Sequence, residues 1–399
     1  MPASALFEIP FELSLCMLAA MCASVLIAMA VLSRALPMLS AEAHDTTRWM
    51  DGLRGIAAVS VALNHAPVVF FNLLLKPEFF TYIWRELVLF WFLGAFGVQI
   101  FFCITGMLFA SKVLCAERVD WTTFFDKRIR RIAPAYAAAC TFALAIVIWY
   151  VWPIKPPARE IFMALPRLLS FGFLPLPTIG EFSFDRVLGV NWTLAIEWRY
   201  YLVLPIVFVF MRHLRWVSVI AIVAFAVADV LLTGKSVWIY FISGALCAPL
   251  MYRQFGPRLR LLGYAGILLA LGLYIKYWEG LKLYGPEQWP MMTLLFASLS
   301  IARPRLLTTR LFVALGTVSY SFYLLHSMAL VVVVAAFHRY VFDLTVLSVG
   351  SFTLLVCVAL MLTTGFATLS YLYIERPFMR SSGRAAWRDR SAPRVDYAP

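Results

Sequence analysis

Long apolar segments recur along the whole chain, and they restrict its fold more than any other feature. Eleven are long enough to form helices: 13–33, 53–75, 87–110, 132–152, 191–211, 216–233, 237–252, 261–278, 289–302, 311–336 and 346–374. Only 14% of the 399 residues are charged, against about a quarter in an ordinary soluble domain. Continuous apolar runs also exclude a membrane β-barrel, whose strands alternate apolar and polar residues. The sequence predicts an all-α, polytopic helical membrane protein with about eleven transmembrane helices.

Basic residues are distributed unevenly between the loops. If the N-terminus lies outside, the cytoplasmic segments carry 22 Lys and Arg and the outer segments carry 10. This bias predicts an outer N-terminus and a cytoplasmic C-terminus. Topology therefore explains the net charge of +13, and nucleic acid is not an expected partner. Short loops and the lack of a sorting signal favour the bacterial inner membrane.

The cysteines, the long segment 152–190 and the C-terminal tail remain to be interpreted. The seven cysteines form no CxxC pair, so neither a disulfide framework nor a metal site is expected. Residues 152–190 are rich in Pro and aromatic residues and are expected outside. They either pack over the outer mouth, enter the membrane partway, or form a cap without ligand contacts. Residues 379–399 are predicted to form a basic cytoplasmic tail near lipid headgroups.

The stretch "DGLRGIAAVSVALNHA" places an arginine and a histidine in one predicted helix, Arg54 and His65. At about 1.5 Å per residue, His65 lies roughly 16 Å deeper than Arg54, on nearly the same face. A guanidinium at the cytoplasmic end suits a phosphate, and a neutral imidazole can act as a general base. The alternative is a structural histidine that bonds a neighbouring helix.

The stretch "DKRIRRIAPAY" concentrates positive charge just before the predicted helix 132–152. Arg128 and Arg131 are three residues apart and share a face, and Pro134 is expected in the first helical turn. Two guanidinium groups on one face suit a polyphosphate or the 3′-phosphate of a nucleotide. The alternative is a basic anchor that sets the topology.

Two further apolar stretches contain polar residues that can take part in chemistry. In "NWTLAIEWRYYLVLP", Glu197 either pairs with Arg199 for structure, or binds a histidine or a sugar hydroxyl near Trp192. In "LGTVSYSFYLLHSMAL", Ser319, Tyr323 and His326 occur at helical spacing, so they either line a polar track or form structural hydrogen bonds.

Together these stretches resemble the signatures of the acyltransferase 3 family of membrane acyltransferases. Besides the Arg54–His65 signature, "GVQIFFCITGMLFA" resembles Phe-Phe-x-x-Ser-Gly and "KRIRRIAPAY" resembles Arg-x-x-Arg-x-x-Pro. Further along, "NWTLAIEWRYYLVLP" resembles Trp-Ser-Leu-x-x-Glu, "GTVSYSFYLLH" resembles Ser-Tyr-x-x-Tyr-Leu-x-His, and "YLYIERPF" resembles the closing Glu-x-Pro-Phe. Thr105 and Thr193 stand where the family usually has serine. Residues 1–47 are interpreted as an extra helix and connector before a family-like core of ten helices at 48–378, without the SGNH-type domain that many members carry.

The resemblance implies transfer of an acyl group, usually acetyl, from cytoplasmic acyl-CoA to a carbohydrate hydroxyl, often a surface polysaccharide or its lipid-linked precursor. Arg54, Arg128 and Arg131 are then expected to bind acyl-CoA, a co-substrate, with no bound cofactor. His65 would be the catalytic base, and Glu197 would orient it or hold the sugar. The residues expected to contact substrate or support the site are Asp51, Trp192, Tyr320, Tyr323 and His326.

Two other functions are compatible with a charged, multi-helix membrane domain. One is a transporter or flippase of a glycan precursor. The other is a non-catalytic partner in the machinery that makes or exports a polysaccharide. Neither explains why the Arg54–His65 pair and the Arg128–Arg131 pair occur together, so the acyltransferase is the favoured hypothesis.

Overall fold

The structure is a computed structural model. It describes residues 11–41, 46–74, 88–115, 118–153, 156–234, 236–277, 281–344 and 348–381. Nearly all of its regular structure is helical, and one short hairpin pairs β1 (Thr178–Ile179) with β2 (Phe182–Ser183). The all-α prediction is confirmed. Most of the predicted tail, residues 382–399, lies outside the described part of the chain.

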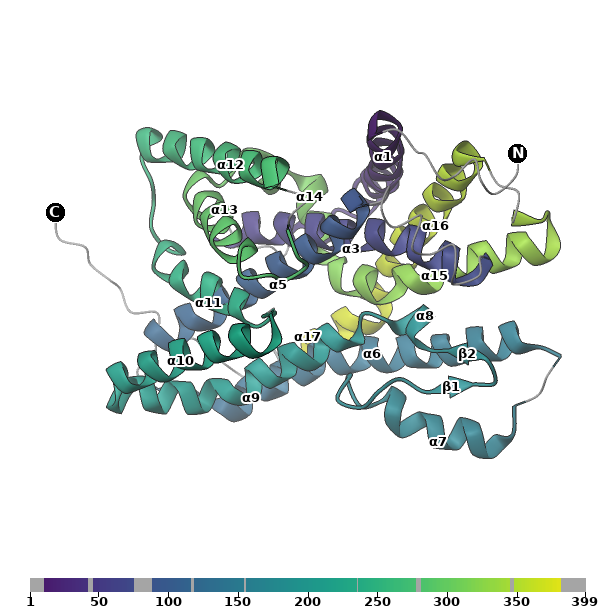
Figure 1. Cartoon of the computed structure of the whole chain (residues 1–399), viewed down its shortest axis with the longest axis horizontal. Helices are drawn as coiled ribbons and strands as arrows, with labels where there is room; N and C mark the ends of the chain where they lie inside the picture. Colours follow the sequence, from purple (N-terminus) through teal and green to yellow (C-terminus); the bar gives the residue numbers. More distant parts are fainter. Residues whose placement is uncertain are drawn as a thin grey trace.

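Among the described residues, nine helices are long and apolar enough to cross a membrane. These nine spans correspond to the following helices (Figure 1): α1 (Phe11–Ala35), α3 (Arg48–Leu74), α5 (Val88–Cys115), α6 (Trp121–Val151), α9 (Asn191–His213), α10 (Arg215–Thr233), α12 (Pro257–Tyr277), α15 (Ser319–Tyr340) and α16 (Val349–Ser370). The other two predicted spans are also helical, but they are shorter. They are α11 (Ile239–Leu246) with the 3₁₀ turn η2 (Ala248–Leu250), and α13 (Gln288–Ala302). The protein is a multi-pass helical membrane protein, as predicted, and the count of eleven spans stays a prediction.

Helix α6 begins eleven residues earlier than predicted, because Asp120 caps it. The Asp120 carboxylate accepts a hydrogen bond from the backbone N–H of Thr123, 3.1 Å away, and so satisfies a donor that the first turn leaves free. The basic cluster is therefore inside the helix, and the expectation that Pro134 occupies the first turn is wrong. Arg128 and Arg131 remain one turn apart on the helix.

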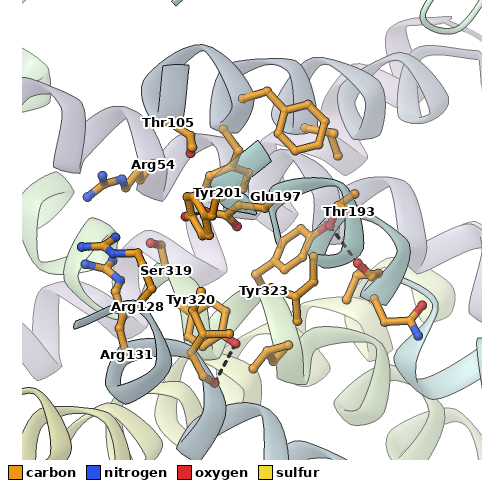
Figure 2. Close-up of a pocket in the computed structure, with 18 of the residues that line it drawn as sticks. Arg54, Thr105, Arg128, Arg131, Thr193, Glu197, Tyr201, Ser319, Tyr320 and Tyr323 are labelled. Atoms are coloured by element: carbon orange, nitrogen blue, oxygen red, sulfur yellow. Dashed lines mark hydrogen bonds between the residues drawn. The ribbon is translucent and has the colours of Figure 1, made fainter. Parts of the chain in front are cut away.

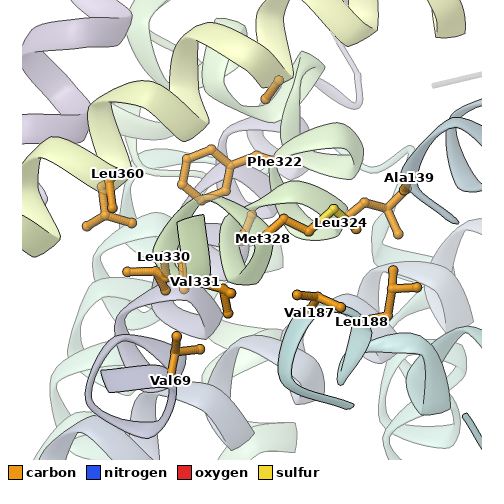
Figure 3. Packing of buried hydrophobic residues seen from close by; sticks show 14 of the residues in the cluster. Val69, Ala139, Val187, Leu188, Phe322, Leu324, Met328, Leu330, Val331 and Leu360 are labelled. Carbon is orange, nitrogen blue, oxygen red and sulfur yellow. The ribbon is translucent and has the colours of Figure 1, made fainter. Parts of the chain in front are cut away.

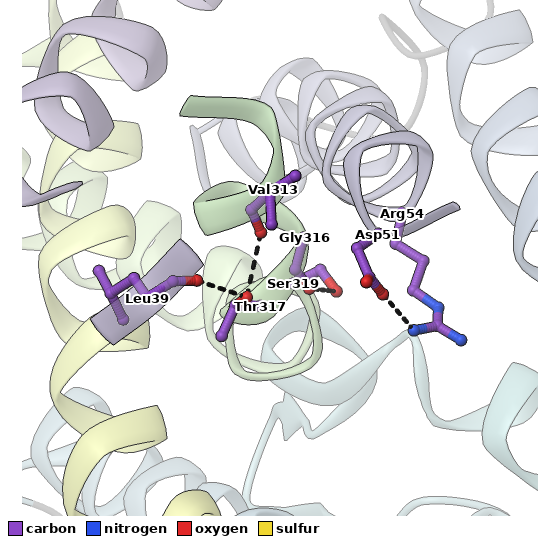
Figure 4. A network of polar contacts seen from close by, with 7 residues as sticks. All are labelled: Leu39, Asp51, Arg54, Val313, Gly316, Thr317 and Ser319. Atoms are coloured by element: carbon purple, nitrogen blue, oxygen red, sulfur yellow. Dashed lines mark hydrogen bonds and ion pairs between the residues drawn. The ribbon is translucent and has the colours of Figure 1, made fainter. Parts of the chain in front are cut away.

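The predicted helix 311–336 is two helices, α14 (Arg310–Thr317) and α15, separated at Val318. The break adjoins a close crossing with α3. A Cβ atom at Gly316 would collide with the carbonyl oxygen of Asp51, so only glycine permits this approach. Around it, Thr317 donates to the carbonyl of Leu39 at 2.7 Å (Figure 4). The crossing holds the start of α15 beside the Asp51 turn of α3.

The described residues of the proline-rich segment, 152–153 and 156–190, are an ordered part of the bundle. They include α7 (Ala158–Leu168), the β1–β2 hairpin and α8 (Asp185–Leu188), which lie along α6 (Figure 1). The Tyr136 hydroxyl on α6 donates to the carbonyl of Leu168 at 2.7 Å. Val187 and Leu188 are fully buried, and Figure 3 shows both pointing toward Met328 of α15. The segment therefore closes the side of α15 instead of running free over the surface.

Candidate active site

A partly open cavity with about 930 Å³ of empty space lies between α3, α5, α6, α9 and α15. Of the ten predicted site residues, six line it: Arg54, Arg128, Arg131, Glu197, Tyr320 and Tyr323. These six come from four helices and from sequence positions up to 269 residues apart. The fold thus brings most of the predicted site to one place.

Positive charge gathers at one end of this cavity. Figure 2 shows the guanidinium groups of Arg54, Arg128 and Arg131 on the same side. Arg54 is paired with Asp51 at 2.9 Å, an (i, i+3) ion pair on α3 (Figure 4). Within the described ranges, neither Arg128 nor Arg131 makes an ion pair. Arg54 is thus the one arginine of the three that makes an ion pair with a described residue, and the cluster is suited to a ligand with several negative charges.

Arg128 is held in place while part of its hydrogen-bonding capacity is unused. Its guanidinium carbon lies 5.2 Å from the centre of the Phe109 ring, in a cation–π contact. Its Nε atom is buried and has no hydrogen-bond partner among the described residues. A buried donor without a partner is costly, so a ligand oxygen that reached it would be bound favourably.

Glu197 lies in the middle of the cavity wall and accepts a hydrogen bond from the hydroxyl of Tyr201, one turn further along α9. The alternative pairing with Arg199 is not what the structure shows. Arg199 is exposed and lies over the ring of Phe173, 5.7 Å from its centre. No hydrogen bond joins Glu197 to His65 in the described part of the chain.

The two predicted tyrosines of α15 both use their hydroxyl protons. Tyr320 donates to the carbonyl of Ile132 at 3.1 Å. Thr193 donates its only proton to the carbonyl of Val190, so in its 2.7 Å contact with Tyr323 the tyrosine is the donor. In this arrangement neither tyrosine has a free hydroxyl proton to donate to a substrate.

His65 and His326 form a pair behind the cavity wall. Nδ1 of His65 lies 3.0 Å from the carbonyl oxygen of Val61 and 3.3 Å from Nε2 of His326. The two ring centroids are 5.0 Å apart, and the ring of Tyr323, which lines the cavity, is 6.0 Å from that of His326. The structure thus brings together two histidines that belong to different sequence motifs.

Trp192 lies apart from these groups. It is partly exposed at the start of α9, and its ring meets the edge of Tyr284 at 6.0 Å.

Several cavity residues were not predicted as site residues. Thr105, Thr193 and Ser319 line the cavity with hydroxyl groups, and Asn191 lines it beside Thr193. Thr105 and Thr193 had a detectable signal, because both lie inside motifs where they replace serine. Ser319 was expected from its helical spacing to lie on a polar track with Tyr323, and both line the cavity. For Asn191, only the packing of α9 against α15 shows that it faces the cavity.

Glu375 was also not predicted. It is 2% exposed in the π-helical turn η6 (Tyr371–Glu375), which follows α16. It accepts a hydrogen bond from Ser321, whose hydroxyl oxygen also lies 2.7 Å from that of Ser370. Its place in the closing motif "YLYIERPF" could have singled it out, but nothing in that motif indicates that its partner is Ser321 on α15.

The sequence is similar to a family of acyltransferases and to several of its members. The sequence model of the acyltransferase 3 family, described as an acyltransferase domain, matches residues 47–369. The chain is 26% identical to acyltransferase MdmB of Streptomyces mycarofaciens, over 84% of this chain and 92% of that protein. It is 24% identical to O-acetyltransferase OatA of Staphylococcus aureus, over 49% of this chain and 30% of OatA. It is 28% identical to the putative peptidoglycan O-acetyltransferase YrhL of Bacillus subtilis, over 41% of this chain and 24% of YrhL.

The chain thus matches almost the full length of MdmB but less than a third of OatA and of YrhL. No solved structure matches it.

Proposed function

Because the chain belongs to the acyltransferase 3 family, we propose that it transfers an acyl group, most simply acetyl, from cytoplasmic acyl-CoA to a hydroxyl of a carbohydrate. The observation that carries this proposal is the cavity itself. Three arginines gather at one end of it, and hydroxyl, carboxylate and imidazole groups lie along and behind its wall. Such a cavity suits a donor with several phosphates and a polar acceptor.

The arginine end is the proposed site for coenzyme A. Its phosphates supply negative charge to Arg128 and Arg131, which make no ion pair with the described residues, and guanidinium groups bind phosphate through paired hydrogen bonds. The positive-inside rule puts this end at the cytoplasmic face, where acyl-CoA is available. The pantetheine arm then runs along the cavity past Glu197 toward Tyr323.

His65 is the proposed general base. It removes the proton from the acceptor hydroxyl, the hydroxyl oxygen bonds to the thioester carbonyl carbon, and the carbon–sulfur bond breaks. The proton then passes from His65 to the departing thiolate, so the imidazole returns to its starting state. Glu197 is proposed to hold the acceptor, because its contact with Tyr201 leaves its second oxygen available for a sugar hydroxyl.

The acceptor is proposed to be a cell-surface polysaccharide or its lipid-linked precursor. The names of two relatives support this class, since OatA is called an O-acetyltransferase and YrhL a putative peptidoglycan O-acetyltransferase. We also propose that the protein lies in the bacterial inner membrane with its N-terminus outside, near the polysaccharide machinery that supplies its acceptor.

Proton NMR of surface glycans from three strains tests this function. The strains are intact, deleted, and complemented with the His65→Ala variant at matched abundance. We expect O-acyl signals to disappear in both altered strains while the glycan otherwise stays the same. If His65→Ala restores the signals, His65 is not the base.

A transport function makes a different prediction. If the protein moves a glycan precursor across the membrane, deletion removes the glycan itself and not only its acyl groups. In that case we also expect that the purified protein does not bind acyl-CoA through Arg128.

A further inference from the structure

We propose that His326 is a positioning residue for His65, and that the two imidazoles form a dyad of which only His65 meets the substrate. This inference rests on the proposed function, because it assumes that His65 accepts the proton of the acceptor hydroxyl. The hydrogen-bond geometry of the pair supports it.

The position of the proton on His65 follows from its backbone contact. Nδ1 of His65 lies 3.0 Å from the carbonyl oxygen of Val61, one turn earlier on α3. A carbonyl oxygen only accepts, so in a neutral ring the proton is on Nδ1 and the lone pair is on Nε2. The backbone therefore sets the tautomer that a base acting through Nε2 requires.

The same contact determines the state of His326. Its Nε2 lies 3.3 Å from the protonated Nδ1 of His65, so Nε2 of His326 must be an acceptor and its own proton must be on Nδ1. Nδ1 of His326 is buried and has no hydrogen-bond partner among the described residues, so the contact with His65 is the hydrogen bond that the structure gives to this ring.

Burial distinguishes the two roles. His326 is fully buried, whereas His65 is partly exposed. Tyr323 separates His326 from the cavity that it lines. His65 is therefore the more accessible of the two rings.

This arrangement stabilises the charged intermediate state of the base. When Nε2 of His65 takes the proton of the acceptor hydroxyl, the ring becomes an imidazolium and its Nδ1–H becomes a stronger donor. The bond to Nε2 of His326 is then charge-assisted, and it returns to a neutral bond once the proton passes to the thiolate. A carboxylate in this position would put a second charge inside the membrane, which is costly, and Glu197 is bonded to Tyr201 instead.

Substitutions that keep or remove the acceptor atom test the dyad. The amide oxygen of His326→Gln can accept from His65, whereas His326→Leu cannot. We expect His326→Leu to lower kcat by about 10- to 100-fold, the effect of losing a hydrogen bond to a charged group. The KM for acetyl-CoA should change less than about twofold. His326→Gln should retain activity within about fivefold.

A matched control lies on the same helix. His338 is twelve residues further along α15, and its ring lies 3.4 Å from the carboxylate of Asp343, away from the pair. His338→Leu makes the same chemical change in the same helix, and we expect it to keep kcat. An equal loss in His338→Leu would overturn the proposal, because the effect would then come from the helix and not from the dyad.

Two further readouts separate positioning from structure. If His326 acts through His65, the variant His65→Ala/His326→Leu should be no slower than His65→Ala alone. The chain has only five histidines, so ¹⁵N-histidine NMR of the full chain in lipid nanodiscs can report the tautomer of His65. A proton on Nε2 of His65 in the resting protein would overturn the proposal.

Failure of the dyad and failure of the proposed function give different results. If the intact protein transfers no acyl group, the proposed function fails and the dyad fails with it. If His65→Ala keeps full turnover, acyl transfer stands, but His65 is not the base and the dyad is wrong. If His65→Ala is inactive while His326→Leu keeps full kcat, the function stands and only the dyad is wrong.

Discussion

Removal of the Arg128 side chain is expected to weaken acyl-CoA binding while leaving the chemical step almost unchanged. The guanidinium is at the cavity end that collects three arginines, and its Nε donor is buried without a partner among the described residues. A hydrogen bond to a charged group contributes about 1.5–3 kcal/mol. Since about 1.4 kcal/mol corresponds to a factor of ten, Arg128→Ala should raise the Kd for acetyl-CoA by roughly 10- to 150-fold.

The matched control is Arg130→Ala, which removes the same charge from the same helix. Arg130 binds Asp126 at 2.8 Å, and both side chains are about half exposed, 40% and 46%. We expect this variant to change the Kd by less than about twofold, because exposed ion pairs contribute little. Equilibrium binding in lipid nanodiscs should compare acetyl-CoA with its 3′-dephospho analogue. A reduced effect of Arg128→Ala on the analogue would show that Arg128 contacts the 3′-phosphate.

Two results would refute this reasoning. If Arg130→Ala weakens binding as much as Arg128→Ala, general positive charge attracts the ligand and the cavity geometry is irrelevant. If Arg128→Ala binds acetyl-CoA normally, coenzyme A does not use the arginine end at all.

Three further predictions concern the framework of the site. Gly316→Ala should lower stability by about 1–3 kcal/mol, because its Cβ would meet the carbonyl of Asp51; thermal unfolding should show no such loss for Gly272→Ala, whose surroundings are open. Thr193→Ser should keep activity, since a hydroxyl still accepts from Tyr323, whereas Thr193→Val should lower kcat about 2- to 10-fold; equal rates would mean that the contact is unimportant. Glu197→Leu should lower stability by about 1–3 kcal/mol by leaving the buried Tyr201 hydroxyl without its acceptor, and Glu197→Gln should recover most of it; identical melting temperatures for the two variants would contradict this.

The sequence alone determined the class of fold and the local geometry of each motif. Inside a bilayer the backbone must satisfy its own hydrogen bonds, so long apolar segments form helices whatever their neighbours are. Helical periodicity then relates residues that are close in sequence. For this reason the common face of Arg128 and Arg131, and the eleven-residue interval between Arg54 and His65, were visible without a structure.

The tertiary structure decided which motifs meet. His65 and His326 are 261 residues apart, and no periodicity within either helix relates them. The break at Val318 lies two residues after Gly316, which packs closely against Asp51 of α3, and the local pattern of apolar residues continued through it. Glu197 bonds Tyr201 instead of Arg199 because helix α9 places residues four apart on one face and residues two apart on different faces. Contacts between distant segments depend on how side chains pack where helices cross, and a single sequence does not contain that information.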